Sequence, residues 1–509
     1  MQLERGKNAS RNMTFGFLLK LYEVVMPFLM RTVIMQQLGA KYLGLNGLFG
    51  SVLQVLNLAE LGVGSAMVFS MYRPIAENDT EKICAYMRLY RLYYRIIGLV
   101  ILTMGLAITP FIPKLVHGDV PPDINLYTLY FLNLGATVMS YWLFAYRNSI
   151  LFAHQRRDLA NKVSLVTHTM MYALQLAALC CFHNYYYYVI VRLLTQVTNN
   201  ILSAVVSKKK YPDYNPRGEL PKQEIKDLNS RVRDLFTSKV GGTIVSSADT
   251  IVISAFLGLE ILAMYQNYYA IMSAIIGFIL IIHSAILAGV GNSMLTKSEE
   301  QNHKEFNIFT LLIAWLCTVC VSCLMSLYQP FMTLWMGKDM LLDDRMVFLF
   351  GVYFWVYEVV KMISVYKDAG GIWHKDRFRP LITGLINLGL NLLMVRWIGL
   401  YGIIISTIIG EGLISTPWII KNVYEFIFPG ERPRTYAISL LLYTAEIFAA
   451  GTISWLITSR IPGGSLLMII VKGLAAVIIS NAVFILVFRK NRYFADAKGL
   501  LHRLLRPSA

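Results

Sequence analysis

The first long apolar stretch of the chain, from Asn12 to Gln36, contains three charged residues, Lys20, Glu23 and Arg31. A charge at the centre of a membrane-spanning helix costs roughly 2.5–3.5 kcal/mol, so such residues normally face a bundle interior or a wet cavity. On a helix, Lys20 and Arg31 lie within about 20° of each other, and Glu23 is one turn from Lys20. One helix face is therefore polar and mostly cationic, and we expect it to line a cavity for an anionic ligand.

Other charged residues also fall inside apolar stretches, namely Glu60, Arg147, Arg192, Lys239, Asp249, Glu358, Lys361, Glu411, Glu446 and Lys472. We expect ligand binding to involve the first-helix residues together with Glu60, Arg147, Arg192, Lys239, Asp249 and Lys361. Two structural alternatives stay open. Arg147 and Lys239 are near predicted helix ends, where a long side chain can reach water. The pairs Lys20/Glu23 and Glu358/Lys361 are each one turn apart, as in a structural ion pair.

This mixture of cations suits a pyrophosphate group, which carries about two negative charges and several acceptor oxygens. Arg binds such oxygens in pairs through two N–H groups, whereas Lys acts as a point charge. The carboxylates of Glu23, Glu60 and Asp249 would lower the positive field of an empty cavity and are places for a proton or a cation. The residues therefore predict an anion site with acidic groups beside it.

The composition identifies a multi-pass membrane protein. The chain has 509 residues, of which 56% are hydrophobic and only 15% charged, and its mean hydropathy is +0.53. The net charge of +17 is spread over short segments between apolar runs, which argues against nucleic acid as a partner. We expect no cofactor, because the six cysteines lie in or beside apolar segments and no GxxxxGK[ST] phosphate-binding loop is present.

Apolar runs of about twenty residues predict fourteen membrane-spanning helices. They cover residues 12–36, 43–72, 93–115, 125–150, 163–182, 185–206, 236–257, 261–288, 306–329, 347–369, 380–397, 400–421, 437–459 and 466–488. With both termini in the cytoplasm, most Lys and Arg residues fall in inside segments, as the positive-inside rule requires. The predicted outside segments hold only Lys41, Lys114, Lys338, Arg345, Arg396 and Arg460. The tyrosines at 185–188 predict an aromatic belt at the outer interface.

The predicted fold is all-α, with two six-helix lobes and two extra C-terminal helices. We place the lobes at 1–206 and 236–421, a cytoplasmic linker at 207–235, the two added helices at 422–488 and a basic cytoplasmic tail at 489–509. Two short matches support an internal repeat, which is typical of transporters. Leu38-Gly39 matches Leu257-Gly258, and GVGSAM from Gly62 matches GVGNSM from Gly289.

The first hundred residues resemble a known family. The resemblance is carried by the first-helix pattern of Lys20, Glu23 and Arg31, by LGAKYLGLNGLFGSVLQVLNLAELGVGSAMVFSMYRPIAENDTEKI from Leu38, and by LYRLYYRIIGLVI from Leu89. These segments are similar to the polysaccharide-transporter branch of the MOP superfamily, the Wzx-type flippases of capsule, O-antigen and exopolysaccharide synthesis. Beyond Asp249 the match is to the helix plan only.

The resemblance implies a V-shaped bundle with a basic central cavity in the bacterial cytoplasmic membrane. It also implies that undecaprenyl-pyrophosphate-linked oligosaccharide is flipped to the outer leaflet, in some members with coupling to a proton or sodium gradient. Implied partners are membrane lipids and, in the same pathway, a polysaccharide polymerase and glycosyltransferases.

Three other functions are compatible with a chain of this kind to different degrees. A MATE-type exporter of drugs and organic cations needs an acidic, aromatic cavity, whereas the first helix is net basic. A MurJ-like lipid II flippase shares the cationic cavity and the fourteen helices, so it stays open. An enzyme such as a polymerase or ligase is not expected, because the longest outer connection, at 330–346, is too short for a catalytic loop.

Overall fold

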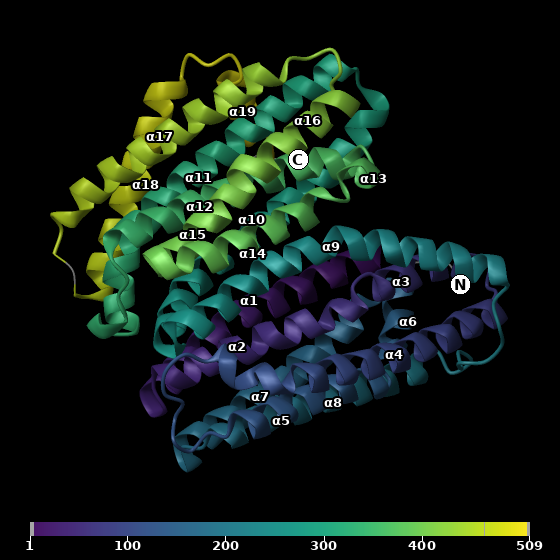
Figure 1. The fold of residues 1–509 in the computed structure, drawn as a ribbon. Helices are drawn as coiled ribbons and strands as arrows, with labels where there is room; N and C mark the ends of the chain where they lie inside the picture. The colour runs from purple at the N-terminus through teal and green to yellow at the C-terminus, as the bar shows by residue number, and fades with distance from the viewer. Residues whose placement is uncertain (1–4, 463, 506–509) are drawn as a thin grey trace. The chain divides into compact units, whose positions relative to one another are not determined.

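The computed structural model describes residues 5–462 and 464–505, and these residues form an all-helical protein (Figure 1). Twelve segments in the described residues are long and apolar enough to cross a membrane, and each lies at a predicted span. The two other predicted spans are also helical, although the one at 125–150 is broken into pieces. The predicted all-α, multi-pass membrane architecture is therefore confirmed. The chain forms two compact units, Met1–Ala263 and Met264–Ala509.

The first unit contains nine α-helices and three short 3₁₀ helices in its described residues. They are α1 (Arg5–Gln37), α2 (Ala40–Leu56), η1 (Asn57–Glu60), α3 (Val63–Ala76), α4 (Thr80–Ile108), η2 (Thr109–Leu115), α5 (Leu126–Trp142), η3 (Ala145–Arg147), α6 (Asn148–Ala153), α7 (Arg157–Phe182), α8 (Tyr185–Lys210) and α9 (Lys222–Leu257). Helix α7 packs on α8 and α1, and α2 packs on α9.

Two predicted spans of this unit are interrupted. The second is divided into α2, η1 and α3, with Gly62 in the left-handed region at φ 92°. The fourth ends as a helix at Trp142 and restarts after Phe144, which has φ 59°. The continuations α3 and α6 pack against each other. Breaks inside membrane helices expose backbone groups and are tolerated where they face protein or water, which makes this region a candidate binding site.

The turns after α1 and α9 have the same unusual backbone. Gly39 has φ 101° and ψ 179°, and Gly258 has φ 91° and ψ 176°. Only glycine adopts this region readily, so both turns depend on it. The predicted match between these two positions is thus also a match in geometry. The second match is not, because Gly62 breaks its helix whereas Gly289 and Gly291 lie within the continuous helix α10 (Leu259–Thr296).

The connection between α8 and α9 is a short strap of residues 211–221 that lies along α4. Arg88 of α4 donates to the backbone oxygen of Gly218 over 2.9 Å and pairs with Glu219 at 3.2 Å. Just beyond the strap, Glu224 pairs with Lys82 at 2.7 Å. Helix α9 starts at Lys222, so the end of the predicted linker and the seventh span form one continuous helix.

The second unit is built around α11. After α10 come α11 (Glu299–Trp335), η4 (Lys338–Met340), α12 (Asp344–Ala369), α13 (Trp373–Asp376), α14 (Arg379–Ile398), α15 (Leu400–Ile408), the π-helix η5 (Ile409–Ser415), α16 (Thr416–Phe426), α17 (Pro433–Ser459), α18 (Leu466–Phe488) and α19 (Phe494–Leu505). The added helices α17 and α18 and the tail helix α19 all pack on α11.

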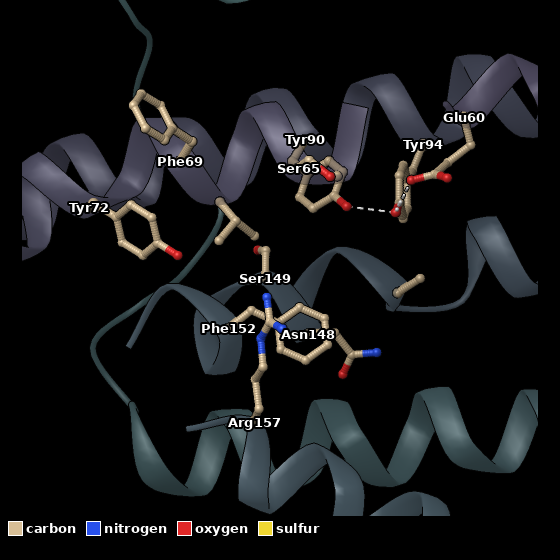
Figure 2. Close-up of a pocket in the computed structure, with 13 residues that line it drawn as sticks. Glu60, Ser65, Phe69, Tyr72, Tyr90, Tyr94, Asn148, Ser149, Phe152 and Arg157 are labelled. Carbon is tan, nitrogen blue, oxygen red and sulfur yellow. Dashed lines mark hydrogen bonds between the residues drawn. The ribbon is translucent and has the colours of Figure 1, made fainter. Parts of the chain in front are cut away.

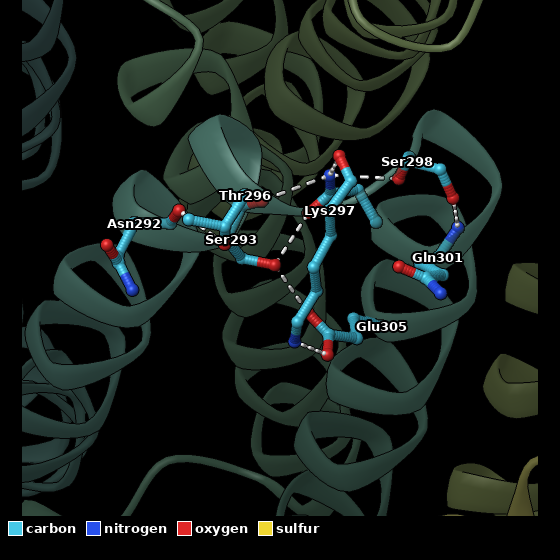
Figure 3. A network of polar contacts seen from close by, with 8 residues as sticks. Asn292, Ser293, Thr296, Lys297, Ser298, Gln301 and Glu305 are labelled. Atoms are coloured by element: carbon cyan, nitrogen blue, oxygen red, sulfur yellow. Dashed lines mark hydrogen bonds and ion pairs between the residues drawn. The ribbon is translucent and has the colours of Figure 1, made fainter.

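Polar contacts fix this packing. The hydroxyl of Thr318 on α11 donates to Glu446 on α17 over 2.8 Å, and the indole of Trp315 donates to Asn481 on α18 over 2.9 Å. Figure 3 shows a similar network at the turn from α10 to α11. There Ser293 donates to Glu305 over 2.8 Å, and Glu305 also pairs with Lys297. Hydrogen-bonded groups of this kind fix the register of apolar helices that would otherwise slide.

Candidate functional site

Arg192 of the first unit lies within a membrane-spanning helix, and its guanidinium is hydrogen-bonded to two neutral side-chain amides. Nη1 of Arg192 on α8 donates to Oδ1 of Asn46 on α2 over 3.1 Å, and Nη2 donates to Oδ1 of Asn133 on α5 over 2.7 Å. Asn133 is 1% exposed and its own amide donates to the backbone of Leu129. Three helices therefore converge on one guanidinium.

A second arginine, Arg31 of α1, shares a neighbour with Arg192. The buried ring of Tyr188 on α8 is in electrostatic contact with both Arg192 and Arg31 of α1. Tyr188 stacks on the fully buried Tyr185, with ring centroids 5.7 Å apart. These two tyrosines are therefore core residues, and the predicted interfacial belt is wrong for them. Their spacing of three residues places both on the inward face of α8.

The two partners of Arg192 accept hydrogen bonds from it without cancelling its charge. No carboxylate of the described residues lies within 4 Å of its guanidinium, and the two amides are neutral. Arg192 is partly buried, and a partly buried cation with no opposite charge beside it carries a desolvation cost that a bound anion would relieve. The arrangement is thus suited to an anionic ligand.

The helix breaks form a second polar cluster, around Glu60 (Figure 2). The hydroxyl of Tyr94 donates to Glu60 over 3.3 Å and in turn accepts from Tyr90 over 2.6 Å. The carboxylate also accepts from the backbone N–H of Gly64 in the first turn of α3, and it is in electrostatic contact with Lys239 of α9. A carboxylate at a helix N-terminus is stabilised by the free N–H groups there.

The two breaks are also joined directly. Tyr141, at the end of α5, donates to Asn57 of η1 over 3.2 Å. Beside this contact lies a cavity of about 490 Å3, lined by Glu60, Gly64, Ser65, Val68, Phe69, Tyr72, Tyr90, Tyr94, Ala145, Asn148, Ser149, Phe152 and Arg157. Figure 2 shows Glu60 and Arg157 at separate places on its wall. The cavity therefore offers an acidic end, a basic end and tyrosine hydroxyls between them.

Three further predicted site residues of the first unit are Lys20, Glu23 and Arg147. Lys20 is half-buried and Glu23 exposed; they form no ion pair in the part of the chain that the structure describes, and Glu23 instead faces His168 and Tyr172 of α7. Arg147 is buried at 9% exposure, near the ring of Tyr146.

Asp249 on α9 is buried, at 4% exposure. Lys361 belongs to the second unit, where it lies 5.0 Å from the ring centroid of Tyr357 and in electrostatic contact with Glu358 and with Glu411 of the π-helix. The fully buried Glu358 is 3.7 Å from His283 of α10. Arg31 and Arg192 thus share the neighbour Tyr188, Glu60 lies within electrostatic range of Lys239, and Lys361 belongs to a polar group of the second unit.

Sequence reasoning missed the uncharged members of the site. Asn46, Asn133 and Tyr188 carry no charge, and single polar residues are common in apolar helices. Tyr90, Tyr94 and Tyr141 were missed for the same reason. A usable signal was Gly62, whose position after a polar Asn57–Glu60 segment marks a helix break beside the tyrosines.

The fold is that of a known class of membrane transporters. The structure of lipid II flippase MurJ in an inward closed conformation superposes with a TM-score of 0.66 at 14% identity, covering 94% of this chain and 99% of that one. An inward-facing multidrug resistance MATE family transporter of the MOP superfamily gives 0.61 at 15% identity, with 83% and 98% covered. A MOP superfamily transporter from Pyrococcus furiosus gives 0.56 at 14% identity, with 84% and 97% covered. The chain therefore has the fold of MOP-superfamily transporters.

The sequence itself matches a family profile described as polysaccharide biosynthesis protein over residues 9–287. The chain belongs to this family, and the predicted resemblance is confirmed. No curated protein sequence matches the chain. Family and fold together define a multi-pass membrane transporter of the MOP type.

Proposed function

We propose that this transporter flips undecaprenyl-pyrophosphate-linked oligosaccharide units from the inner to the outer leaflet of the bacterial cytoplasmic membrane, for capsule, exopolysaccharide or O-antigen export. The observation that carries the proposal is the arginine pair of the first unit. Arg192 is held by Asn46 and Asn133, which leave its charge in place, and Arg31 approaches the same tyrosine. Both termini are proposed to be cytoplasmic.

The pyrophosphate is the part of this substrate that the cations recognise. Two guanidinium groups can each bind phosphate oxygens through paired N–H donors, and in partly dry surroundings these charge-assisted bonds are strong. Arg31 lies on α1 and Arg192 on α8, so a rearrangement of α1 against α8 would change the affinity of the site for pyrophosphate. Alternating access between the two predicted lobes supplies such a rearrangement.

The other predicted site residues have secondary roles in this proposal. Lys20, Lys239, Arg147 and Lys361 add positive potential along the route. Glu23, Glu60 and Asp249 limit that potential and are the candidate sites for a coupling proton or sodium ion. We propose no cofactor, and a polymerase and glycosyltransferases of the same pathway as functional partners.

Two alternative substrates bear on the choice of experiment. An organic cation would be repelled by the uncompensated charge of Arg192, so drug export is disfavoured by the same observation. A lipid II flippase would be served equally well by the arginines. The family of polysaccharide biosynthesis proteins favours the oligosaccharide substrate over lipid II.

The experiment is a leaflet-exchange assay in proteoliposomes with a fluorescent undecaprenyl-pyrophosphate-oligosaccharide, with lipid II and a cationic dye as parallel substrates. We expect transport of the lipid-linked oligosaccharide, its loss in Arg192→Ala, and normal transport in the control Arg460→Ala, which removes an exposed arginine after α17. Dye export without lipid movement, or equal transport in both variants, would contradict the proposal.

A further inference from the structure

A second basic site lies away from the arginine pair, in a groove between α4 and the strap. Its cavity of about 460 Å3 is lined by Ala85, Arg88, Leu89, Arg91, Leu92, Arg95, Gly218, Glu219, Leu220, Lys222 and Ile225. Arg88, Arg91 and Arg95 are spaced three and four residues apart, so they follow one face of α4. Lys222, at the start of α9, contributes a fourth positive charge to the same groove.

The charges of this groove are not balanced. Glu219 is its one lining carboxylate, and it pairs with Arg88 at 3.2 Å. Within the described residues, no carboxylate lies within 4 Å of the side chains of Arg91, Arg95 or Lys222. Three cations thus share one groove without a counter-ion from the protein, which makes the groove a place for a phosphate anion.

The apolar surface next to the groove continues along α4. Leu92, Ile96 and Leu99 are exposed by 51%, 50% and 56%, and they follow the arginines toward the middle of the helix. From Ile96 to the end of η2 at Leu115 the chain has the length of about 30 Å that the hydrocarbon core of a bilayer requires. Arg95 therefore lies at the edge of the hydrocarbon core.

A tryptophan marks the same level. The indole of Trp142, at the end of α5, donates to the backbone oxygen of Arg95 over 3.2 Å, packs over Gly98 and is 42% exposed. Tryptophans with an apolar body and a polar N–H are enriched at the level of lipid headgroups. Arginines above this level and apolar side chains below it match the two parts of a phospholipid.

We infer that this groove binds an anionic glycerophospholipid of the membrane, separately from the transported substrate. Arg91 and Arg95 hold the phosphodiester, Lys222 approaches it from α9, and the acyl chains lie along Leu92, Ile96 and Leu99. Basic pockets at the headgroup level of membrane helices bind anionic lipids in this way. Because the groove has one wall on α4 and the other on the strap, the bound lipid also fastens the strap to α4.

The test measures lipid binding by the full chain in nanodiscs of phosphatidylcholine with increasing phosphatidylglycerol, read as the shift in thermal unfolding midpoint and as lipid retained in native mass spectrometry. We expect a saturable shift with one tightly retained phosphatidylglycerol. In Arg91→Gln/Arg95→Gln the binding should weaken by roughly 30-fold, as expected for two surface cations near anionic lipid.

The control variant is Lys208→Gln/Lys209→Gln, which removes the same charge from exposed positions at the end of α8 outside the groove. This variant should show the same lipid-induced shift in thermal unfolding midpoint as the wild type. An equal loss in both double variants would reduce the effect to overall charge and overturn the inference. So would an equal shift with glycerol phosphate in solution, or displacement of the retained lipid by equimolar undecaprenyl pyrophosphate, which would assign the groove to a soluble anion or to the substrate.

Discussion

The guanidinium of Arg192 on α8 donates a 2.7 Å hydrogen bond to the side-chain oxygen of Asn133 on α5. An amide at this position satisfies a donor but leaves the cation uncompensated. A carboxylate of the same shape would accept the hydrogen bond and also neutralise the positive charge. The choice of Asn over Asp therefore distinguishes a cation kept for a ligand from one kept for stability.

Asn133→Asp should consequently reduce transport of the lipid-linked oligosaccharide at least about tenfold, because the new ion pair competes with the pyrophosphate for Arg192. The thermal unfolding midpoint should change little, because the ion pair offsets the hydrogen bond to Leu129 that the amide loses. The matched control is Asn184→Asp at the N-cap of α8, where Asp caps as well as Asn. Both variants are measured by proteoliposome transport and thermal unfolding. Normal transport by Asn133→Asp would show that the charge of Arg192 is not used.

Glu60 is expected to act on stability through the start of α3. Its carboxylate accepts from the N–H of Gly64 and from Tyr94 at the helix break. Glu60→Ala should lower the free energy of unfolding by about 1 kcal/mol, the usual effect of losing a cap, and Glu60→Gln should lower it less because an acceptor oxygen remains. Thermal unfolding of the purified variants checks this order. If Glu60→Gln is as stable as wild type but inactive, the charge itself serves transport.

The helices were predictable because a bilayer demands runs of about twenty apolar residues, and that length is visible in any hydropathy pattern. The ends were less predictable. Helices α9, α10 and α11 have 36, 38 and 37 residues, longer than a membrane requires, and α9 and α11 begin in charged, polar sequence before their predicted spans. The pattern of apolar residues gives no signal for this continuation.

Only the charged residues of the site could be predicted from the sequence. Arg31 and Arg192 are conspicuous because charge inside an apolar helix is costly. Their environment depends on Asn46, Asn133 and Tyr188, which meet only when α2, α5 and α8 pack. The expected belt of tyrosines failed for a related reason. Composition places aromatic residues at an interface, but the helical angle decides that Tyr185 turns inward while Tyr187 stays 49% exposed.

Gly44 and Gly50 on α2 provide a test of the close contact between this helix and the turn that follows α9. A Cβ at Gly44 would lie 2.2 Å from the backbone oxygen of Leu259, whereas a Cβ at Gly50 would meet no atom within 4 Å. Gly44→Ala should therefore destabilise the protein by several kcal/mol, since backbone cannot rotate away, and Gly50→Ala should be neutral or stabilise by about 0.5–1 kcal/mol. Unfolding midpoints in detergent decide the matter, and similar midpoints for the two variants would show that the helix and turn are not in contact.

His154 makes attachment of the strap depend on pH. Its ring stacks on Tyr211 at 4.2 Å and on Tyr214 at 5.5 Å, and it is 5% exposed. Burial lowers the pKa of His154 to about 4, whereas a free histidine has a pKa of about 6.5. The detached strap thus binds more protons than the attached one between these values. Stability of the attached strap is complete above pH 7 and falls as the pH drops from 6.5 toward 4.

Between pH 7.5 and 5.0 the expected loss is about 2 kcal/mol. Hydrogen exchange of residues 211–221, corrected for the intrinsic effect of pH, measures it directly. Neither ring partner titrates in this range, since burial raises the pKa of Tyr211 to about 12 and that of Tyr214 above its ordinary value. His154→Phe keeps the stacking but removes the proton site, so its strap should exchange at one rate at both pH values. If that variant still loosens at pH 5.0, the carboxylates of Glu219 and Glu224, and not the imidazole, control the strap.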